Sequence, residues 1–158
     1  MIKYRVIKIN RVNAPIIADL VCRTYQTFNK NEGDKKSIKA FLSQFDNSSC
    51  SADDLIKKFK KSTINFGAFS GTKIIGIIRG NKNRITNLFI DGKFHHQGIG
   101  KRLIELFESH AKKEGSKFIK VRSSIYATNF YLRSGYKKTT GIRLYHGLKI
   151  QPLEKKIK

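Results

Sequence analysis

The chain has 158 residues, 39% of them hydrophobic, which suits a single domain (residues 1–158) with a sizeable core and excludes a disordered protein. No run spans a bilayer and the N-terminal residues lack the pattern of a cleaved signal, so a cytoplasmic protein without a membrane partner is expected. The net charge of +22 either attracts anions such as nucleotides or RNA, or reflects a composition rich in Lys, Ile and Asn. Cys22 and Cys50 make neither a metal spacing nor a disulfide framework.

The N-terminal part of the chain predicts one strand and then helices. Apolar and polar residues alternate over residues 2–9, which is typical of a strand. Asn13 is the expected N-cap of the first helix, and Pro15 is tolerated in the first turn. Apolar residues at helical spacing predict three helices, over residues 13–28, 37–45 and 51–60.

The remainder predicts strands around two further helices. A long helix begins at Gly98 and ends before Gly115, and a short one covers residues 125–133. Strands are predicted over residues 65–69, 74–79, 84–90, 118–122, 136–140 and 142–150. This order predicts an α+β (mixed α/β) domain, with a largely antiparallel twisted sheet of about seven strands and helices on both faces.

The stretch of residues 83–115 is organised as a strand, a loop with Gly98 and Gly100, and a helix. The first amides of a helix have no partner within it, and the helix dipole favours an anion there. Because these glycines lack a Cβ, a phosphate can come close to the amides. Lys101 and Arg102 add positive charge at the same end. The stretch is therefore either a phosphate-binding loop or an ordinary turn with two glycines.

This loop can be compared with three known phosphate-binding motifs. A P-loop needs Ser or Thr where Arg102 stands. A dinucleotide fingerprint needs a third glycine where Leu103 stands, and an acidic residue about twenty positions on, where Lys120 stands. The third motif is Gln/Arg-x-x-Gly-x-Gly/Ala, the pyrophosphate loop of GNAT-type N-acetyltransferases. It is matched with His95 in the Gln/Arg place.

Residues 121–136 carry a second motif, Asn-x-x-Ala-x-x-x-Tyr followed by Gly-Phe/Tyr. Ser124 stands in the Asn place, and the matching residues are Ala127, Tyr131, Gly135 and Tyr136. With the loop ahead of it and the order of elements, nearly the whole chain resembles the GNAT superfamily. Within that superfamily it is similar to a small, poorly characterised bacterial branch.

The resemblance implies acetyl-CoA as co-substrate, no metal, and a GNAT-like fold in which two neighbouring strands splay apart around the co-substrate. These would be the strands that end at Ile90 and Arg122. The pantetheine arm then pairs like an added strand. The expected cofactor-binding residues are Leu88, Phe89, Ile90, His95, His96, Gln97, Gly98, Ile99, Gly100, Lys101 and Ser124. A histidine at 95 predicts a mild pH dependence of affinity.

The resemblance also implies direct transfer of the acetyl group to a primary amine. A main-chain amide near Phe89 or Ile90 would stabilise the oxyanion. Tyr131 would be the catalytic residue, a general acid that protonates the leaving thiolate. The sequence does not single out a general base, and the candidates are Glu32, Asp34 and His146.

Three functions stay open. The leading one is an N-acetyltransferase for a small amine, a protein N-terminus or a lysine. An acceptor carried on RNA, such as an aminoacyl-tRNA, is the second, because the charge of +22 favours polyanions. The third is a non-catalytic module that binds acetyl-CoA or nucleic acid. The resemblance is compatible with a homodimer, but no segment of the sequence indicates a dimer interface.

Overall fold

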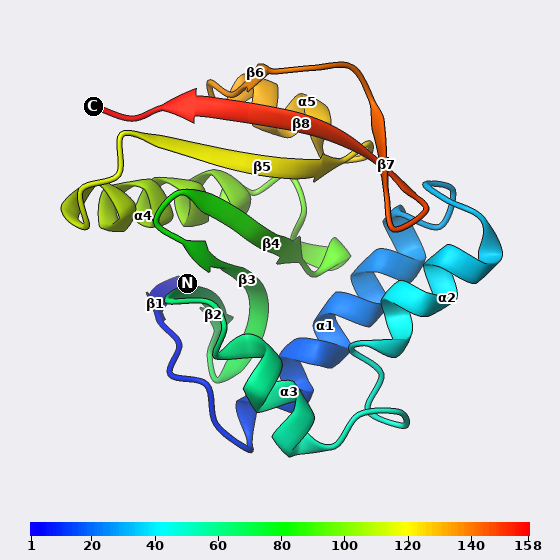
Figure 1. Cartoon of the computed structure of the whole chain (residues 1–158). Coiled ribbons are helices and arrows are strands. Elements are labelled where there is room, and N and C mark those ends of the chain that lie inside the picture. The colour runs from blue at the N-terminus through cyan, green and yellow to red at the C-terminus, as the bar shows by residue number, and fades with distance from the viewer.

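A computed structural model describes residues 1–158, which fold around one sheet of eight strands (Figure 1). The strands are β1 (Ile2–Val6), β2 (Ile64–Ser70), β3 (Lys73–Asn81), β4 (Arg84–Ile90), β5 (Phe118–Ser124), β6 (Lys137–Lys138), β7 (Arg143–Tyr145) and β8 (Leu148–Lys156). Their order is β1-β2-β3-β4-β5-β8-β6, with β7 also paired to β8. Only β4 and β5 pair in parallel. The predicted fold class is confirmed, with eight strands where about seven were expected.

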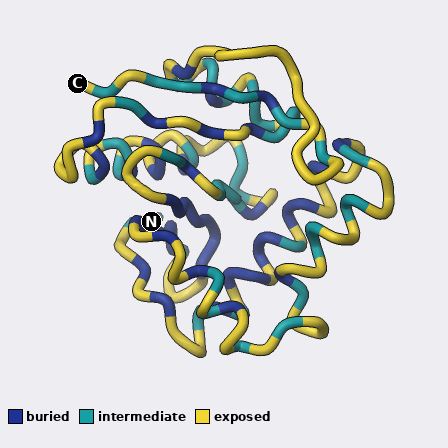
Figure 2. The backbone as a smooth tube through the Cα atoms, viewed as in Figure 1, coloured by how far each residue is buried: buried dark blue, intermediate teal, exposed yellow.

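Helices cover both faces of the sheet. They are α1 (Asn13–Phe28), α2 (Lys35–Ser43), α3 (Ala52–Phe59), α4 (Ile99–Lys113) and α5 (Thr128–Arg133). A cluster of 16 buried residues lies beneath α4 and α5, and a second cluster of 13 lies beneath α1 and α3. Figure 2 shows the buried positions concentrated along β2, β3 and the inner sides of the helices. None of the helices combines the length and the apolar character that a membrane crossing requires.

The N-terminal elements differ from the prediction at their ends. The first strand stops at Val6, because Ile7 and Ile9 turn into the core against α1. Helix α1 does begin at Asn13, but Val12 is its N-cap. Helix α2 begins two residues earlier than expected, because the Asp34 carboxylate accepts a hydrogen bond from the Ser37 amide at 2.7 Å and caps the helix.

The C-terminal prediction was wrong in one respect. The single strand expected over residues 142–150 is a hairpin, in which β7 and β8 are joined by His146 and Gly147. Both turn residues have positive φ, 52° and 78°, as a two-residue hairpin turn requires. Strand β8 then continues to Lys156 and pairs with β5. The helix expected over residues 125–133 is shorter and begins at Thr128.

The pairing of β4 with β5 is short, and this opens the sheet. The two strands pair only at Arg84 with Lys120 and at Ile85 with Val121. Beyond these pairs, β4 carries one extra residue, Thr86, relative to its other neighbour β3. Such a bulge bends a strand and increases its twist. The strands therefore separate towards Ile90 and Ser124, as the sequence predicted.

Candidate active site

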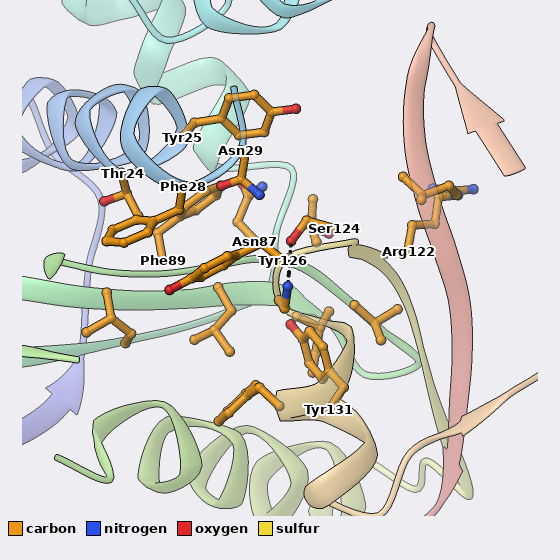
Figure 3. A pocket seen from close by; sticks show the side chains of 18 of the residues that line it. Thr24, Tyr25, Phe28, Asn29, Asn87, Phe89, Arg122, Ser124, Tyr126 and Tyr131 are labelled. Carbon is orange, nitrogen blue, oxygen red and sulfur yellow. Dashed lines mark hydrogen bonds between the residues drawn. The ribbon is translucent and has the colours of Figure 1, made fainter. Parts of the chain in front are cut away.

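A cleft of about 1350 Å³ opens where β4 and β5 separate (Figure 3). Its walls come from segments far apart in the chain: the loop after α1, the ends of β4 and β5, the starts of α4 and α5, and the β7–β8 hairpin. The cleft thus joins the end of the glycine loop to the middle of the sheet. The loop after the first helix and the last strands both line it.

The end of β4 presents free main-chain groups to the cleft. The Asp91 amide donates to the Ile75 carbonyl at 2.8 Å. In an antiparallel pair the bonded positions alternate, so Phe89 faces Ile77 of β3. The polar groups of Leu88 and Ile90 therefore point away from β3, towards the gap. The oxyanion was expected to bind the amide of Phe89 or of Ile90, and of these two only the Ile90 amide points into the gap.

The glycine loop leaves the first amides of helix α4 without partners. Gly98 is its N-cap with φ of 79°, a conformation in which a side chain is strained, and open space surrounds its Cα. Every amide from His96 to Lys101 is free of main-chain and side-chain acceptors in the chain. The His95 amide, also expected to be free, instead donates to the Gly92 carbonyl at 3.3 Å. Gly100 packs against Phe130, so a Cβ there would lie 3.0 Å from the ring.

The His95 ring is held by both its neighbours and the main chain. Its Nε2 donates to the Ile90 carbonyl at 2.7 Å, since a carbonyl oxygen only accepts. Phe28 contacts both other rings, with its centroid 4.5 Å from that of His95 and 5.0 Å from that of Tyr126, while the centroids of His95 and Tyr126 are 6.4 Å apart. We call Phe28, His95 and Tyr126 the aromatic bracket. It connects α1, the glycine loop and the β5–α5 turn across one end of the cleft, and in Figure 3 Tyr126 extends beneath Phe28.

Tyr131 lies at the floor of the cleft on α5. Its side chain is 3% exposed and packs edge-on against Phe130 and Tyr136, with centroids 5.4 Å away in each case. Burial raises the pKa of Tyr131 well above its usual value, so the phenol stays protonated at neutral pH. The hydroxyl points up into the cleft (Figure 3) and forms no hydrogen bond within the chain. It is therefore free to donate to a bound molecule.

Ser124 has a structural contact that accounts for its place in the motif. Its Oγ accepts a hydrogen bond from the Ala127 amide at 3.1 Å, and its carbonyl accepts one from the Thr128 hydroxyl at 2.9 Å. These bonds close the turn between β5 and α5, as Asn, Asp or Ser commonly do at a helix start. Ser124 also lines the cleft.

The three candidate bases occupy very different places. Glu32 is 6% exposed and lines the cleft, where its carboxylate accepts hydrogen bonds from the Asn29 side-chain amide and, at 2.9 Å, from the Tyr126 main chain. Asp34 is an exposed helix cap outside the cleft, and its hydrogen bonds with Ser37 lower its pKa. His146 lines the cleft from the hairpin turn. Glu32 and His146 remain as candidates.

Several cleft residues have no signature in the sequence. The aromatic bracket assembles from positions 28, 95 and 126, and only His95 belonged to a motif. Arg79 is 6% exposed and lines the cleft from near the C-terminal end of β3. Its charge directly after the apolar run of residues 74–78 was the available signal, since a buried strand position rarely carries arginine.

The comparison with known proteins settles the family. The family model described as acetyltransferase (GNAT) domain matches residues 27–157. The chain belongs to the GNAT acetyltransferase family. The family and the fold predicted from the sequence are therefore confirmed, and acetyl-CoA is the co-substrate of this family. No curated protein sequence matches the chain.

Solved structures of GNAT proteins share the fold over their whole length. The GCN5-related N-acetyltransferase of Rhodopseudomonas palustris superposes with a TM-score of 0.82 at 14% identity, covering 98% of this chain and 95% of that one. The PaiA N-acetyltransferase of Thermoplasma acidophilum, in complex with coenzyme A, has a TM-score of 0.74 at 16% identity and 99% coverage of both chains. An aminoglycoside 6'-acetyltransferase of type Ii has a TM-score of 0.72 at 16% identity, covering 98% and 96%. At these identities the likeness concerns the fold.

Proposed function

We propose that the protein is an acetyl-CoA-dependent N-acetyltransferase that moves the acetyl group directly to a primary amine. One observation carries the proposal: the gap between β4 and β5 connects free main-chain groups of β4, a helix end with unpartnered amides, and a buried phenol without a hydrogen-bond partner. Each of the three matches one part of acetyl-CoA, namely the pantetheine amides, the pyrophosphate and the thioester sulfur.

The co-substrate is held mainly by the main chain. The amides from His96 to Lys101 bind the pyrophosphate, with Gln97 and Lys101 able to add side-chain contacts. The pantetheine arm pairs with the outward groups of Leu88, as an added strand does. Because the His95 ring bonds to the Ile90 carbonyl and stacks in the aromatic bracket, its role is to hold the loop against β4. That the PaiA protein, which has the same fold, was solved in complex with coenzyme A supports coenzyme A binding by this chain.

The reaction requires attack by the amine, stabilisation of the oxyanion and protonation of the leaving thiolate. The amine nitrogen attacks the carbonyl carbon, the oxyanion is stabilised by the Ile90 amide, and the carbon–sulfur bond then breaks. The thiolate takes the proton of the Tyr131 hydroxyl, and the phenolate regains a proton from the attacking nitrogen, which loses one as the amide forms. We assign Tyr131 as the general acid, since its pKa is raised by burial and its hydroxyl has no other partner.

Glu32 is the preferred proton acceptor for the attacking amine. It is the only acidic residue that lines the cleft, and it lies beside Tyr126 of the aromatic bracket, close to the end of β4. Both carboxylate oxygens already accept one hydrogen bond, and each keeps a further lone pair for a water or an ammonium group. Proton transfer through one water is compatible with this arrangement.

The proposal is tested by incubating the protein with acetyl-CoA and a panel of primary amines. We expect thiol release that depends on the amine, and a product that is heavier by one acetyl group in mass spectrometry. Binding of acetyl-CoA without turnover of any amine would favour the non-catalytic module. Turnover only with aminoacyl-tRNA, together with steeply salt-dependent RNA binding, would favour the RNA-borne acceptor that the charge of +22 also supports.

A further inference from the structure

The part of the cleft on the α1 and α3 side of the sheet is strongly basic. It is lined by Lys58, Lys61, Arg79, Arg84 and Arg122, and the only acidic residue along the entire cleft is Glu32. None of the five takes part in a salt bridge. The cleft therefore presents uncompensated positive charge to whatever occupies it.

Arg79 is the most informative of these residues because it is buried. Its Nε donates to the Asn87 Oδ1 at 2.6 Å and its Nη1 donates to the Ser62 Oγ at 2.7 Å. Its guanidinium lies 5.0 Å from the Phe59 ring centroid. All these partners are neutral, Nη2 has no hydrogen bond within the chain, and burial lowers the pKa of Arg79 to about 10. A buried cation is costly unless an anion compensates it, and the chain supplies none here.

Arg84 and Arg122 bring two further cations to the same cleft, from the two strands that border the gap. Arg84 begins β4, and Arg122 lies on β5 with its guanidinium 4.3 Å from the Tyr145 ring centroid. Burial and the neighbouring Arg122 together lower the pKa of Arg84. Figure 3 shows Arg122 on the opposite side of the cleft from Phe28 and Tyr126.

These arginines are separate from the nucleotide-binding loop. Arg79 contacts Phe59, which belongs to the buried cluster under α1 and α3. The start of α4 belongs to the other face, where Ile99 lies in the cluster under α4 and α5. The pyrophosphate of acetyl-CoA and the arginines thus meet opposite faces of the sheet. A second anion is needed to compensate the arginines.

We propose that the acceptor is a small amine that carries an anionic group, and that Arg79, Arg84 and Arg122 bind this group. The inference rests on the proposed N-acetyltransferase function. Asn87, which holds Arg79, lies three residues before Ile90 on β4, so the anion and the reacting amine are separated by roughly 10 Å at about 3.3 Å per strand residue. An α-amino acid is too short for this span, whereas three extended residues of a peptide match it. A polycation such as a polyamine or an aminoglycoside is disfavoured.

The test measures equilibrium binding to the full chain by calorimetry in the presence of saturating coenzyme A, so it needs no turnover. Triglycine is compared with triglycine amide, which has the same amine and length but no carboxylate. We expect triglycine to bind at least about tenfold more tightly, as charge-assisted hydrogen bonds do. Glucosamine 6-phosphate compared with glucosamine shows whether the anion is a phosphate rather than a carboxylate.

Variants test whether the arginines cause the preference for the anionic ligand. In the double variant Arg84→Gln and Arg122→Gln the preference for the anionic member of the pair should fall at least about fivefold, while coenzyme A binding stays unchanged. Neither side chain is fully buried, so this variant is expected to fold. The control Lys138→Gln removes one exposed charge outside the cleft and should keep the preference.

The inference is overturned if the neutral members bind as tightly as the acids, if spermidine binds more tightly than both, or if only RNA binds. Its failure differs from failure of the proposed function, which would appear as absence of coenzyme A binding or of amine-dependent thiol release.

Discussion

Replacing Tyr131 by Phe tests the assigned general acid with little disturbance of the fold. The hydroxyl makes no hydrogen bond within the chain, and the ring keeps its edge-on contacts with Phe130 and Tyr136. We therefore expect the free energy of unfolding to change by less than about 0.5 kcal/mol. The transition state loses its proton donor, and kcat should fall by about 10²- to 10⁴-fold, which corresponds to about 3 to 5 kcal/mol.

The pH profile gives a second readout of the same variant. Because burial keeps the pKa of Tyr131 well above 10, the phenol remains protonated throughout an assay between about pH 6 and pH 10. The rate of the wild type should rise as the amine loses its proton, and should not fall again in this range. Tyr131→Phe should keep the shape of the profile at a lower rate.

Tyr136→Phe is the matched control. Its ring is 5.4 Å from that of Tyr131 and equally buried, but its hydroxyl donates to Glu108 at 3.1 Å rather than pointing into the cleft. This control should lose about 1 kcal/mol of stability in urea denaturation and keep its kcat. The reasoning is refuted if Tyr131→Phe transfers acetyl at the wild-type rate, or if both variants slow the reaction equally.

Other variants test the loop after α1, the hairpin turn and the buried tyrosines. Glu32→Gln leaves one hydrogen-bond donor without its acceptor, so stability in urea should fall by about 1–3 kcal/mol. Its kcat should also fall at pH 7 and recover as the amine deprotonates at higher pH; an unchanged profile would remove Glu32 as the proton acceptor. Gly147→Ala places a Cβ at positive φ where it overlaps the Ser37 side chain and should lower the Tm, whereas Gly141→Ala, in open space, should not. Burial raises the pKa of Tyr136 above that of the unfolded chain, so the unfolded state releases this proton first above about pH 10. Stability, present in full below that pH, should then fall by about 1.4 kcal/mol per pH unit for this residue, and Tyr136→Phe should reduce the slope in pH-dependent denaturation.

Local signals were sufficient for the elements that flank the glycine loop. Strand β4 has the predicted bounds, and α4 begins after Gly98 and ends before Gly115 as expected. In this segment the change from strand to helical periodicity, the glycines and the N-terminal charges all agree. The same holds for α3, whose N-cap Ser51 forms a capping box with Asp54.

The errors lie where a contact distant in the chain decides the conformation. A histidine at positive φ in the turn of the β7–β8 hairpin has no local cause in the sequence. Its neighbour Leu148 instead forms a bridge with Gly33, over a hundred positions earlier in the chain. The extra residue in β4 and the bond between Arg79 and Asn87 depend on strand register, which periodicity alone does not specify. For this reason the strand, glycine loop and helix along one wall of the cleft were predictable from motifs, and the arginines were not.

The most direct measurement is calorimetric binding of acetyl-CoA to the wild type, to Gly98→Glu and to Gly115→Glu. Both glycines have positive φ, 79° and 88°, and open space around them, so both variants carry the same added charge and a similar backbone strain of about 1 kcal/mol. Only Gly98 lies at the end of α4 with free amides. We predict micromolar binding by the wild type and Gly115→Glu, and binding at least about tenfold weaker by Gly98→Glu. Absence of binding by the wild type, or equal binding by the two variants, would contradict the assignment of this loop.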